Sequence, residues 1–131
     1  MTEHTLKIDD MIPEIQGKPQ RIRAGEIRQT IQRVKDSPVR VGDTVVIKLA
    51  YNSELLIGIY EVNEVHYVTL HHTGIMLEGP VVDSFHPWHQ LKKLAAMDGI
   101  APPTGEALGE VMVKCYGDRL DDGLPAQIIR W

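Results

Sequence analysis

The chain has 131 residues, 43% of them apolar and 24% charged, and carries a net charge of −4 at pH 7. These values predict one ordinary domain with an apolar core, and they exclude a protein that coats nucleic acid through its overall charge. The single cysteine excludes an internal disulfide, and no apolar run reaches the ~20 residues of a membrane span, so we expect a cytoplasmic protein without a secretory signal or membrane contact.

Residues 1–17 predict an N-terminal arm, and residues 18–131 the domain itself. Pro13 and Gly17 interrupt any long helix in the arm. We therefore expect only a short strand there, at residues 6–8.

The segment after the arm combines a turn of helix with a strand. Pro19 favours a helical turn over residues 20–24, which Gly25 ends. Residues 28–34 then alternate as a strand. The alternation places Arg28, Thr30 and Gln32 on one face of this strand, and Gln29, Ile31 and Arg33 on the other.

Further short strands follow along the chain. Residues 44–50 are apolar enough to be buried on both faces, and a hairpin turn is expected at residues 52–54. Residues 55–70 predict a long β-region that breaks near residues 63–64, and another strand is expected at residues 74–77. Short strands at this spacing are typical of a small barrel or sandwich.

The last third of the chain is predicted to be mainly helical. Residues 87–97 predict a helix that begins at its proline. Thr104 is a favourable N-cap for a second helix, which has Cys115 on its inner face and ends at Gly117. Residues 126–131 predict a closing strand. The sequence therefore predicts an α+β domain, a small β-barrel with flanking helices.

Positive charge is concentrated in residues 18–48. This segment contains 8 Lys/Arg and 3 Asp/Glu, whereas the rest of the chain contains 6 Lys/Arg and 15 Asp/Glu. Such a concentration is typical of a surface that binds an anionic partner, although a solvated strand with scattered ion pairs is the alternative. The candidate contacts to phosphates or bases are Arg23, Arg28, Gln29, Thr30, Arg33 and Arg40.

Three stretches carry a resemblance to a known family. The first joins Ile22-Arg23-Ala24-Gly25 to Arg28-Gln29-Thr30-Ile31, the second is Val41-Gly42-Asp43-Thr44, and the third comprises residues 94–100, Cys115-Tyr116-Gly117 and Ile128-Ile129-Arg130-Trp131. Over residues 16–131 the chain resembles small phage and bacterial members of the ASCH domain family, which is related to PUA RNA-binding domains. The resemblance implies a PUA-like β-barrel with a cleft beside the signature loop that binds RNA or a nucleoside.

The resemblance also implies a reaction. Some small bacterial members hydrolyse N4-acetylcytidine with a Lys and a Thr of the signature and a distant acidic residue. Thr30 matches the Thr and Asp98 the acid, but Ile27 occupies the Lys position. Arg28 cannot supply the base that a Thr hydroxyl needs, because a guanidinium stays protonated. A lysine from elsewhere would have to reach the hydroxyl, and the candidates are Lys18, Lys35 and Lys48.

Two more residues join the candidate nucleotide-binding set. Gly25 permits a positive φ and a close approach of backbone amides to an anion. Trp131 ends the expected closing strand, where it would either stack on a base or pack over the barrel mouth. No cofactor is expected. Five histidines, His66, His71, His72, His86 and His89, also predict no metal site, because zinc sites usually show tightly paired ligands with Cys or acidic partners, whereas the only Cys lies far off and His86-x-x-His89 straddles an expected helix start.

Three functions remain open from the sequence. The first is a module that binds RNA, a nucleotide or a nucleoside in a basic cleft. The second is an amidohydrolase of acylated pyrimidine nucleosides that uses Thr30 and Asp98. The third is a phage accessory scaffold with a protein partner on its acidic surface.

Overall fold

The computed structural model describes residues 2–52 and 54–131. Its first sheet has three strands in the order β1-β3-β4, with β1 parallel and β4 antiparallel to the central β3. The strands are β1 (Glu3–Ile8), β3 (Thr44–Leu49) and β4 (Leu56–Glu61). The segment expected to be an arm thus contributes a whole edge strand, and Leu6 and Ile8 of that strand are buried in the core.

The second sheet has five strands in the order β2-β8-β5-β6-β7, and each neighbouring pair is antiparallel. The C-terminal strand β8 lies between β2 and β5, so the end of the chain is paired on both sides. The strands are β2 (Gln29–Arg33), β8 (Leu124–Arg130), β5 (Glu64–Leu70), β6 (Gly74–Leu77) and β7 (Ser84–Pro87).

The two sheets are joined on one side and open on the other. The chain passes from β4 to β5 through two residues, Val62 and Asn63, and the backbone N–H of Asn63 donates to the carbonyl of Arg130 (3.0 Å). On the other side the edge strands β1 and β2 share no ladder, and the described strands form two sheets and no closed barrel. The predicted α+β class is confirmed.

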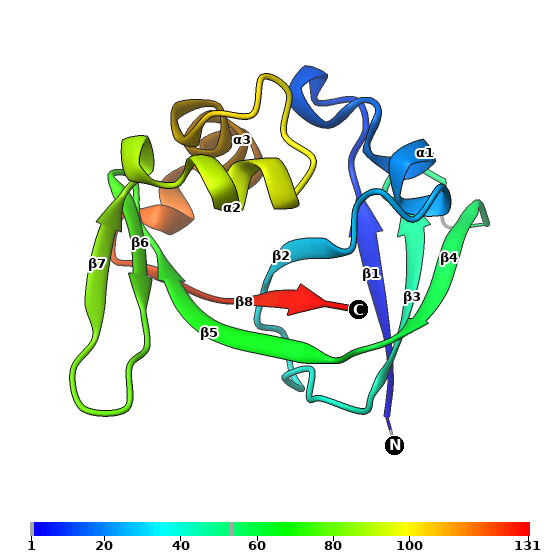
Figure 1. Ribbon diagram of the computed structural model, residues 1–131, viewed down its shortest axis with the longest axis horizontal. Coiled ribbons are helices and arrows are strands. Elements are labelled where there is room, and N and C mark those ends of the chain that lie inside the picture. The colour runs from blue at the N-terminus through cyan, green and yellow to red at the C-terminus, as the bar shows by residue number, and fades with distance from the viewer. Residues whose placement is uncertain (1, 53) are drawn as a thin grey trace.

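The helices gather at one end of the curved sheets, above β1 and β2 (Figure 1). They are α1 (Lys18–Arg23), α2 (Lys92–Met97) and α3 (Gly105–Tyr116), with short 3₁₀ turns at Pro13–Ile15, Trp88–Gln90 and Gly117–Leu120. Thr104 caps α3, since its hydroxyl accepts from the N–H of Ala107 (3.1 Å), as the sequence predicted. One core connects these helices to the inner faces of both sheets.

Two local predictions are wrong. Pro87 does not begin a helix; it ends β7 in an extended conformation opposite Gly74, and α2 begins only at Lys92. Cys115 is exposed at the edge of the inner face of α3, because the buried stripe ends at Met112. A turn is expected at residues 52–54, but Ser53 within it lies outside the described residues.

Candidate active site

Four polar side chains are buried together beneath the helices. Lys18, Gln29, Thr30 and Asp98 are each no more than 3% exposed. A lysine or an aspartate is almost never buried this deeply unless it is paired. We call these four residues the polar cluster.

Lys18 connects the polar cluster. Its Nζ donates to Asp98 Oδ2 at 3.1 Å and to Thr30 Oγ1 at 3.4 Å. Gln29 Nε2 donates to the other carboxylate oxygen, Asp98 Oδ1, at 3.2 Å. Thr30 Oγ1 accepts a second bond, from Gln32 Nε2 at 3.1 Å. An amine therefore lies between a hydroxyl and a carboxylate, which is the order that nucleophilic catalysis requires.

Each member is placed by a local feature of its element. Lys18 is the first residue of α1, directly after Gly17. Asp98 ends α2 as its C-cap, and Gly99 follows with φ +77°, a conformation that glycine adopts without strain. A side chain on Gly99 would press against Ile27 at 3.2 Å. The turn after Asp98 is thus fixed by packing as well as by backbone geometry.

Burial controls the electrostatics of the pair. Desolvation raises the pKa of Asp98 above its ordinary value, and it outweighs the opposing effects of Lys18 and Gln29, which lower it. Protons are therefore held more tightly by this carboxyl than by an exposed aspartate.

A surface ion pair orients the cluster from outside. Arg130 Nε donates to Gln29 Oε1 at 2.9 Å, so the Gln29 amide turns its NH₂ group toward Asp98. Arg130 also pairs with Glu64, whose pKa is lowered chiefly by the hydrogen bond with His66 and further by the Arg130 charge. The orientation of Asp98 thus depends on a chain of contacts that reaches solvent.

A small cleft opens onto the polar cluster. It has a volume of about 80 Å³ and includes Lys18, Thr30 and Asp98 in its lining. Its other walls are mostly apolar and come from Ile8, Ile15, Ile31, Val111 and Met112, with Cys115 and Tyr116 beside them. We call it the amine cleft. Burial raises the pKa of Tyr116 to about 12, so this side chain stays a neutral phenol there.

A second cleft gathers most of the other predicted binding residues. Arg23, Gly25, Arg28 and Trp131 line a cavity of about 230 Å³ with Tyr60. The rings of Tyr60 and Trp131 stack with their centroids 5.3 Å apart. Gly25 has φ +76° in the turn between α1 and β2. The structure thus places six of the predicted site residues in two clefts, Thr30 and Asp98 in one and these four in the other.

Four residues line neither cleft: Gln29 of the polar cluster, Arg33, Arg40 and Ile27. Arg33 ends β2 and is exposed. Arg40 precedes β3, where its backbone N–H donates to Asp43 Oδ2 (3.0 Å). Ile27, at the family's Lys position, is a core residue that is 2% exposed.

Sequence reasoning missed part of this site. The sequence leaves Lys18 as one of three candidate lysines, and it places Gln32 on the same strand face as Thr30 without giving it a role. The run Gly17-Lys18-Pro19 carried a weak signal, since a cation at the start of a helix opposes the helix dipole and needs a compensating partner.

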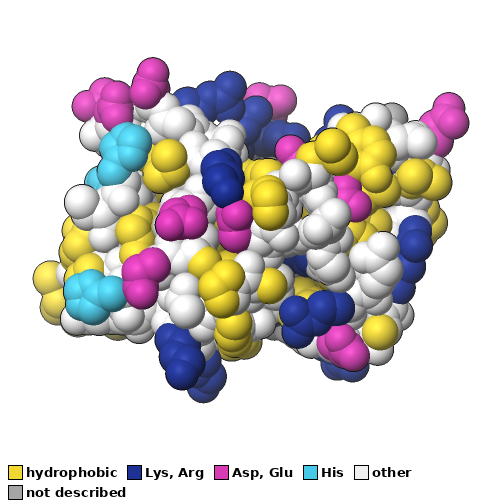
Figure 2. Space-filling view, turned by 90° about the horizontal axis from the view of Figure 1, so that it is seen from above, with side chains coloured by type: hydrophobic (Ala, Val, Ile, Leu, Met, Phe, Trp, Pro, Cys, Tyr) yellow, Lys and Arg dark blue, Asp and Glu magenta, His cyan; other side chains and the backbone are white. Residues whose placement is uncertain are grey.

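Charges of both signs mix over the helical end of the molecule (Figure 2). Acidic side chains there alternate with Lys and Arg and with apolar groups. Within residues 2–52 and 54–131, no group of three or more His, Cys, Asp or Glu side chains is placed to hold a metal ion. The described helices include none with the length and apolarity needed to cross a membrane.

Comparison of the chain with models of protein families, with curated proteins and with solved structures found no match.

Proposed function

We propose that this protein is an amidohydrolase that removes a small acyl group from the exocyclic amine of a pyrimidine nucleoside such as N4-acetylcytidine. The observation that carries the proposal is the position of Lys18 Nζ, 3.4 Å from Thr30 Oγ1 and 3.1 Å from Asp98 Oδ2. The family pattern has a lysine where this chain has Ile27. In this proposal Lys18 supplies the amine from a different place in the chain.

Thr30 is the nucleophile in this proposal. Lys18 Nζ first gives a proton to Asp98, and Oγ1 then attacks the acyl carbonyl carbon while its own proton passes to Lys18 Nζ. The amide NH₂ of Gln32 stabilises the oxyanion that forms. The C–N bond then breaks, and the nucleoside amine leaves with the proton from Lys18. Water hydrolyses the resulting ester and restores the Thr30 hydroxyl.

The size of the amine cleft favours a small acyl group. About 80 Å³ equals the volume of two or three water molecules in the liquid. That space fits an acetyl group but not a nucleobase, so the nucleoside would lie outside the amine cleft and only its acyl group would enter.

We also propose that the two sheets form an opened version of the PUA-like barrel. The short β4–β5 connection joins them on one side. On the other, β1 and β2 meet through a side chain, because Gln32 Nε2 donates to the carbonyl of Lys7 (3.5 Å).

The test is to incubate the protein with N4-acetylcytidine and to measure cytidine by chromatography. We expect conversion by the wild type and by Thr30→Ser, and loss of at least about a hundredfold in Thr30→Ala. Thr69→Ala, a strand threonine outside the polar cluster, is the matched control. Absence of conversion by well-folded wild-type protein would reject the proposal.

The second candidate is a binding module for RNA or a nucleotide. It is favoured by the cleft in which Arg23 and Arg28 accompany the stacked Tyr60 and Trp131. Binding of single-stranded RNA there should weaken as salt rises, because phosphate contacts release counterions. Arg28→Ala should weaken it further, and titrations that detect no RNA binding at low salt would exclude this function.

A further inference from the structure

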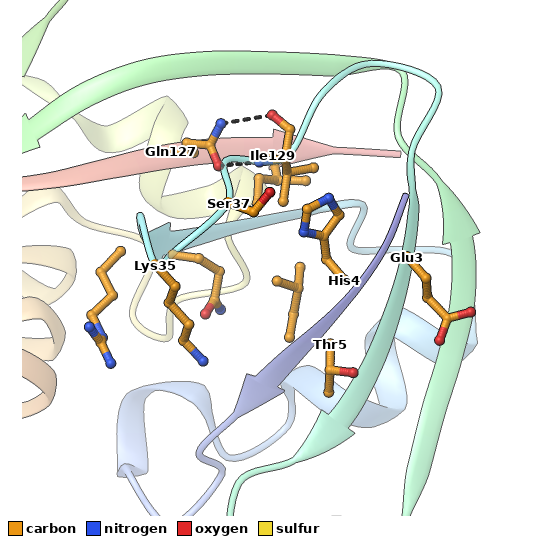
Figure 3. Close-up of a pocket in the computed structure, with 11 residues that line it drawn as sticks. Glu3, His4, Thr5, Lys35, Ser37, Gln127 and Ile129 are labelled. Carbon is orange, nitrogen blue, oxygen red and sulfur yellow. Dashed lines mark hydrogen bonds between the residues drawn. The ribbon is translucent and has the colours of Figure 1, made fainter. Parts of the chain in front are cut away.

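A third hollow lies in the open side of the fold, between the unpaired edges of β1 and β2. Its volume is about 240 Å³, three times that of the amine cleft. Figure 3 shows Lys35 extending from the end of β2 toward this space, with Thr5 and His4 of β1 on the opposite side. We call this cavity the edge cavity.

The edge cavity adjoins the amine cleft. Along β1, residues 3–6 line the edge cavity and residues 7–9 line the amine cleft. Along β2 the earlier residue, Thr30, lines the amine cleft and the later residue, Arg33, lines the edge cavity. The two strands therefore pass the two hollows in opposite directions. Gln32 lines both. The two hollows therefore adjoin at the Gln32 side chain, and together we call them the groove.

The lining of the edge cavity suits a ligand with an apolar body and a negative end. Leu6, Val39 and Ile129 form an apolar wall. Gln127 is not free to bind a ligand strongly, because its amide makes two bonds with the Val39 backbone, at 2.8 and 2.9 Å (Figure 3).

Two cationic side chains that line the edge cavity are available to bind a ligand. Arg33 and Lys35 are both exposed, and within residues 2–52 and 54–131 neither forms an ion pair. Glu3 is the one carboxylate in the lining. Two free cations next to an apolar wall and a hydroxyl, that of Ser37, are the chemistry that recognises a phosphate group.

We propose that the edge cavity binds the base, sugar and phosphate of the substrate, so that the preferred substrate is a phosphorylated acyl-nucleoside rather than the free nucleoside. This inference rests on the proposed amidohydrolase function. The backbone spacing agrees with it: Arg33 and Thr30 are three strand residues apart, which is about 10 Å, and Arg33 lines the edge cavity although the two side chains alternate in direction along the strand. A nucleotide that places its acyl group at Thr30 has a comparable reach to its 5′-phosphate.

The experiment compares kcat/KM for N4-acetylcytidine 5′-monophosphate with that for N4-acetylcytidine. We expect the wild type to favour the nucleotide by about tenfold to a hundredfold, and Arg33→Gln/Lys35→Gln to bring the ratio close to one. Lys92→Gln/Lys93→Gln removes two exposed cations from α2 and should keep the ratio. A wild-type ratio near one, or loss of the preference in Arg23→Gln/Arg28→Gln instead, would overturn the inference.

Two further measurements distinguish failure of the phosphate subsite from failure of the proposed amidohydrolase function. A short oligonucleotide with an internal N4-acetylcytidine shows whether the phosphate belongs to RNA, since it would then be hydrolysed faster than the mononucleotide. If neither monomer is hydrolysed, the proposed function fails, and titration with CMP and cytidine decides the subsite alone. If CMP binds more tightly than cytidine, and the difference depends on Arg33 and Lys35, the phosphate subsite is supported. Equal binding of CMP and cytidine rejects the subsite.

Discussion

Lys18 and Asp98 are 80 positions apart in the chain, yet Lys18 Nζ donates to Asp98 Oδ2 at 3.1 Å in the interior of the protein. Both side chains are almost fully buried. A buried ion pair rarely stabilises a fold more than apolar residues of the same size would. Its presence here is therefore better explained by chemistry at Thr30 than by stability.

The ion pair leads to a prediction about stability. Lys18→Met and Asp98→Asn should each lower the free energy of unfolding by about 3 to 5 kcal/mol, because each leaves one partner of the pair alone in the interior. The double variant should lose less than the two single losses combined. Urea unfolding of the four proteins measures this coupling, and additive losses would show that the two groups act independently.

The same pair predicts a pH dependence in Lys18→Met. Removing Lys18 removes the largest influence that lowers the pKa of Asp98, so burial raises that pKa further. A raised pKa means that the folded state binds the proton more tightly than the unfolded state. The variant should therefore lose stability as pH rises above about 4, the unperturbed aspartate value.

Most of the secondary structure could be predicted from the sequence, but the site could be predicted only in part. Alternation located β2, and the capping residue located the start of α3, because both signals are local. The partnership of Lys18 with Thr30 was not predictable, because it depends on how α1 packs over β2. The extended Pro87 was misread because proline suits the start of a helix and a strand edge equally.

Gln32 is predicted to contribute to the reaction directly. Its amide NH₂ bonds to Thr30 Oγ1 at 3.1 Å and is placed to donate to the oxyanion. Gln32→Leu should lower kcat by about 10²- to 10³-fold. Gln16→Leu, an exposed glutamine outside the groove, is the control, and steady-state kinetics with an unaltered kcat for Gln32→Leu would remove Gln32 from the mechanism.

Asp43 is predicted to make the attachment of β1 sensitive to acid. Its carboxylate accepts from the backbone N–H of Thr2 and pairs with His4 at 2.9 Å. The hydrogen bond with His4 is the main cause of its lowered pKa. A lowered pKa stabilises the fold above about pH 4, and this contribution is lost as pH falls through the folded-state value.

Asp43→Asn should therefore flatten the acid limb of the stability curve. Urea midpoints measured between pH 2 and pH 7 test this expectation. The control is Asp36→Asn, at an exposed residue whose carboxylate has no such partners among residues 2–52 and 54–131. Equal acid limbs in the wild type and in Asp43→Asn would contradict it.

Cys115 is predicted to react slowly and to report on the amine cleft. Part of the residue is exposed, but burial of the thiol raises its pKa to about 11. Because the thiolate is the reactive form, alkylation by iodoacetamide should be slow at pH 7.5 and should accelerate steadily toward pH 11. Mass spectrometry follows the rate at the chain's one cysteine. A ligand in the amine cleft should slow it, and rapid alkylation at neutral pH would contradict this description of Cys115.

The central claim is that Lys18 and Thr30 act as one catalytic unit. Hydrolysis of N4-acetylcytidine by Lys18→Met, Thr30→Ala and the double variant tests it most directly. Groups that act together give losses that do not add. We therefore expect three nearly equal rates, each at least about a hundredfold below the wild type. A double variant that falls by the product of the two single losses, or a Lys18→Met variant as active as the wild type, would contradict the claim.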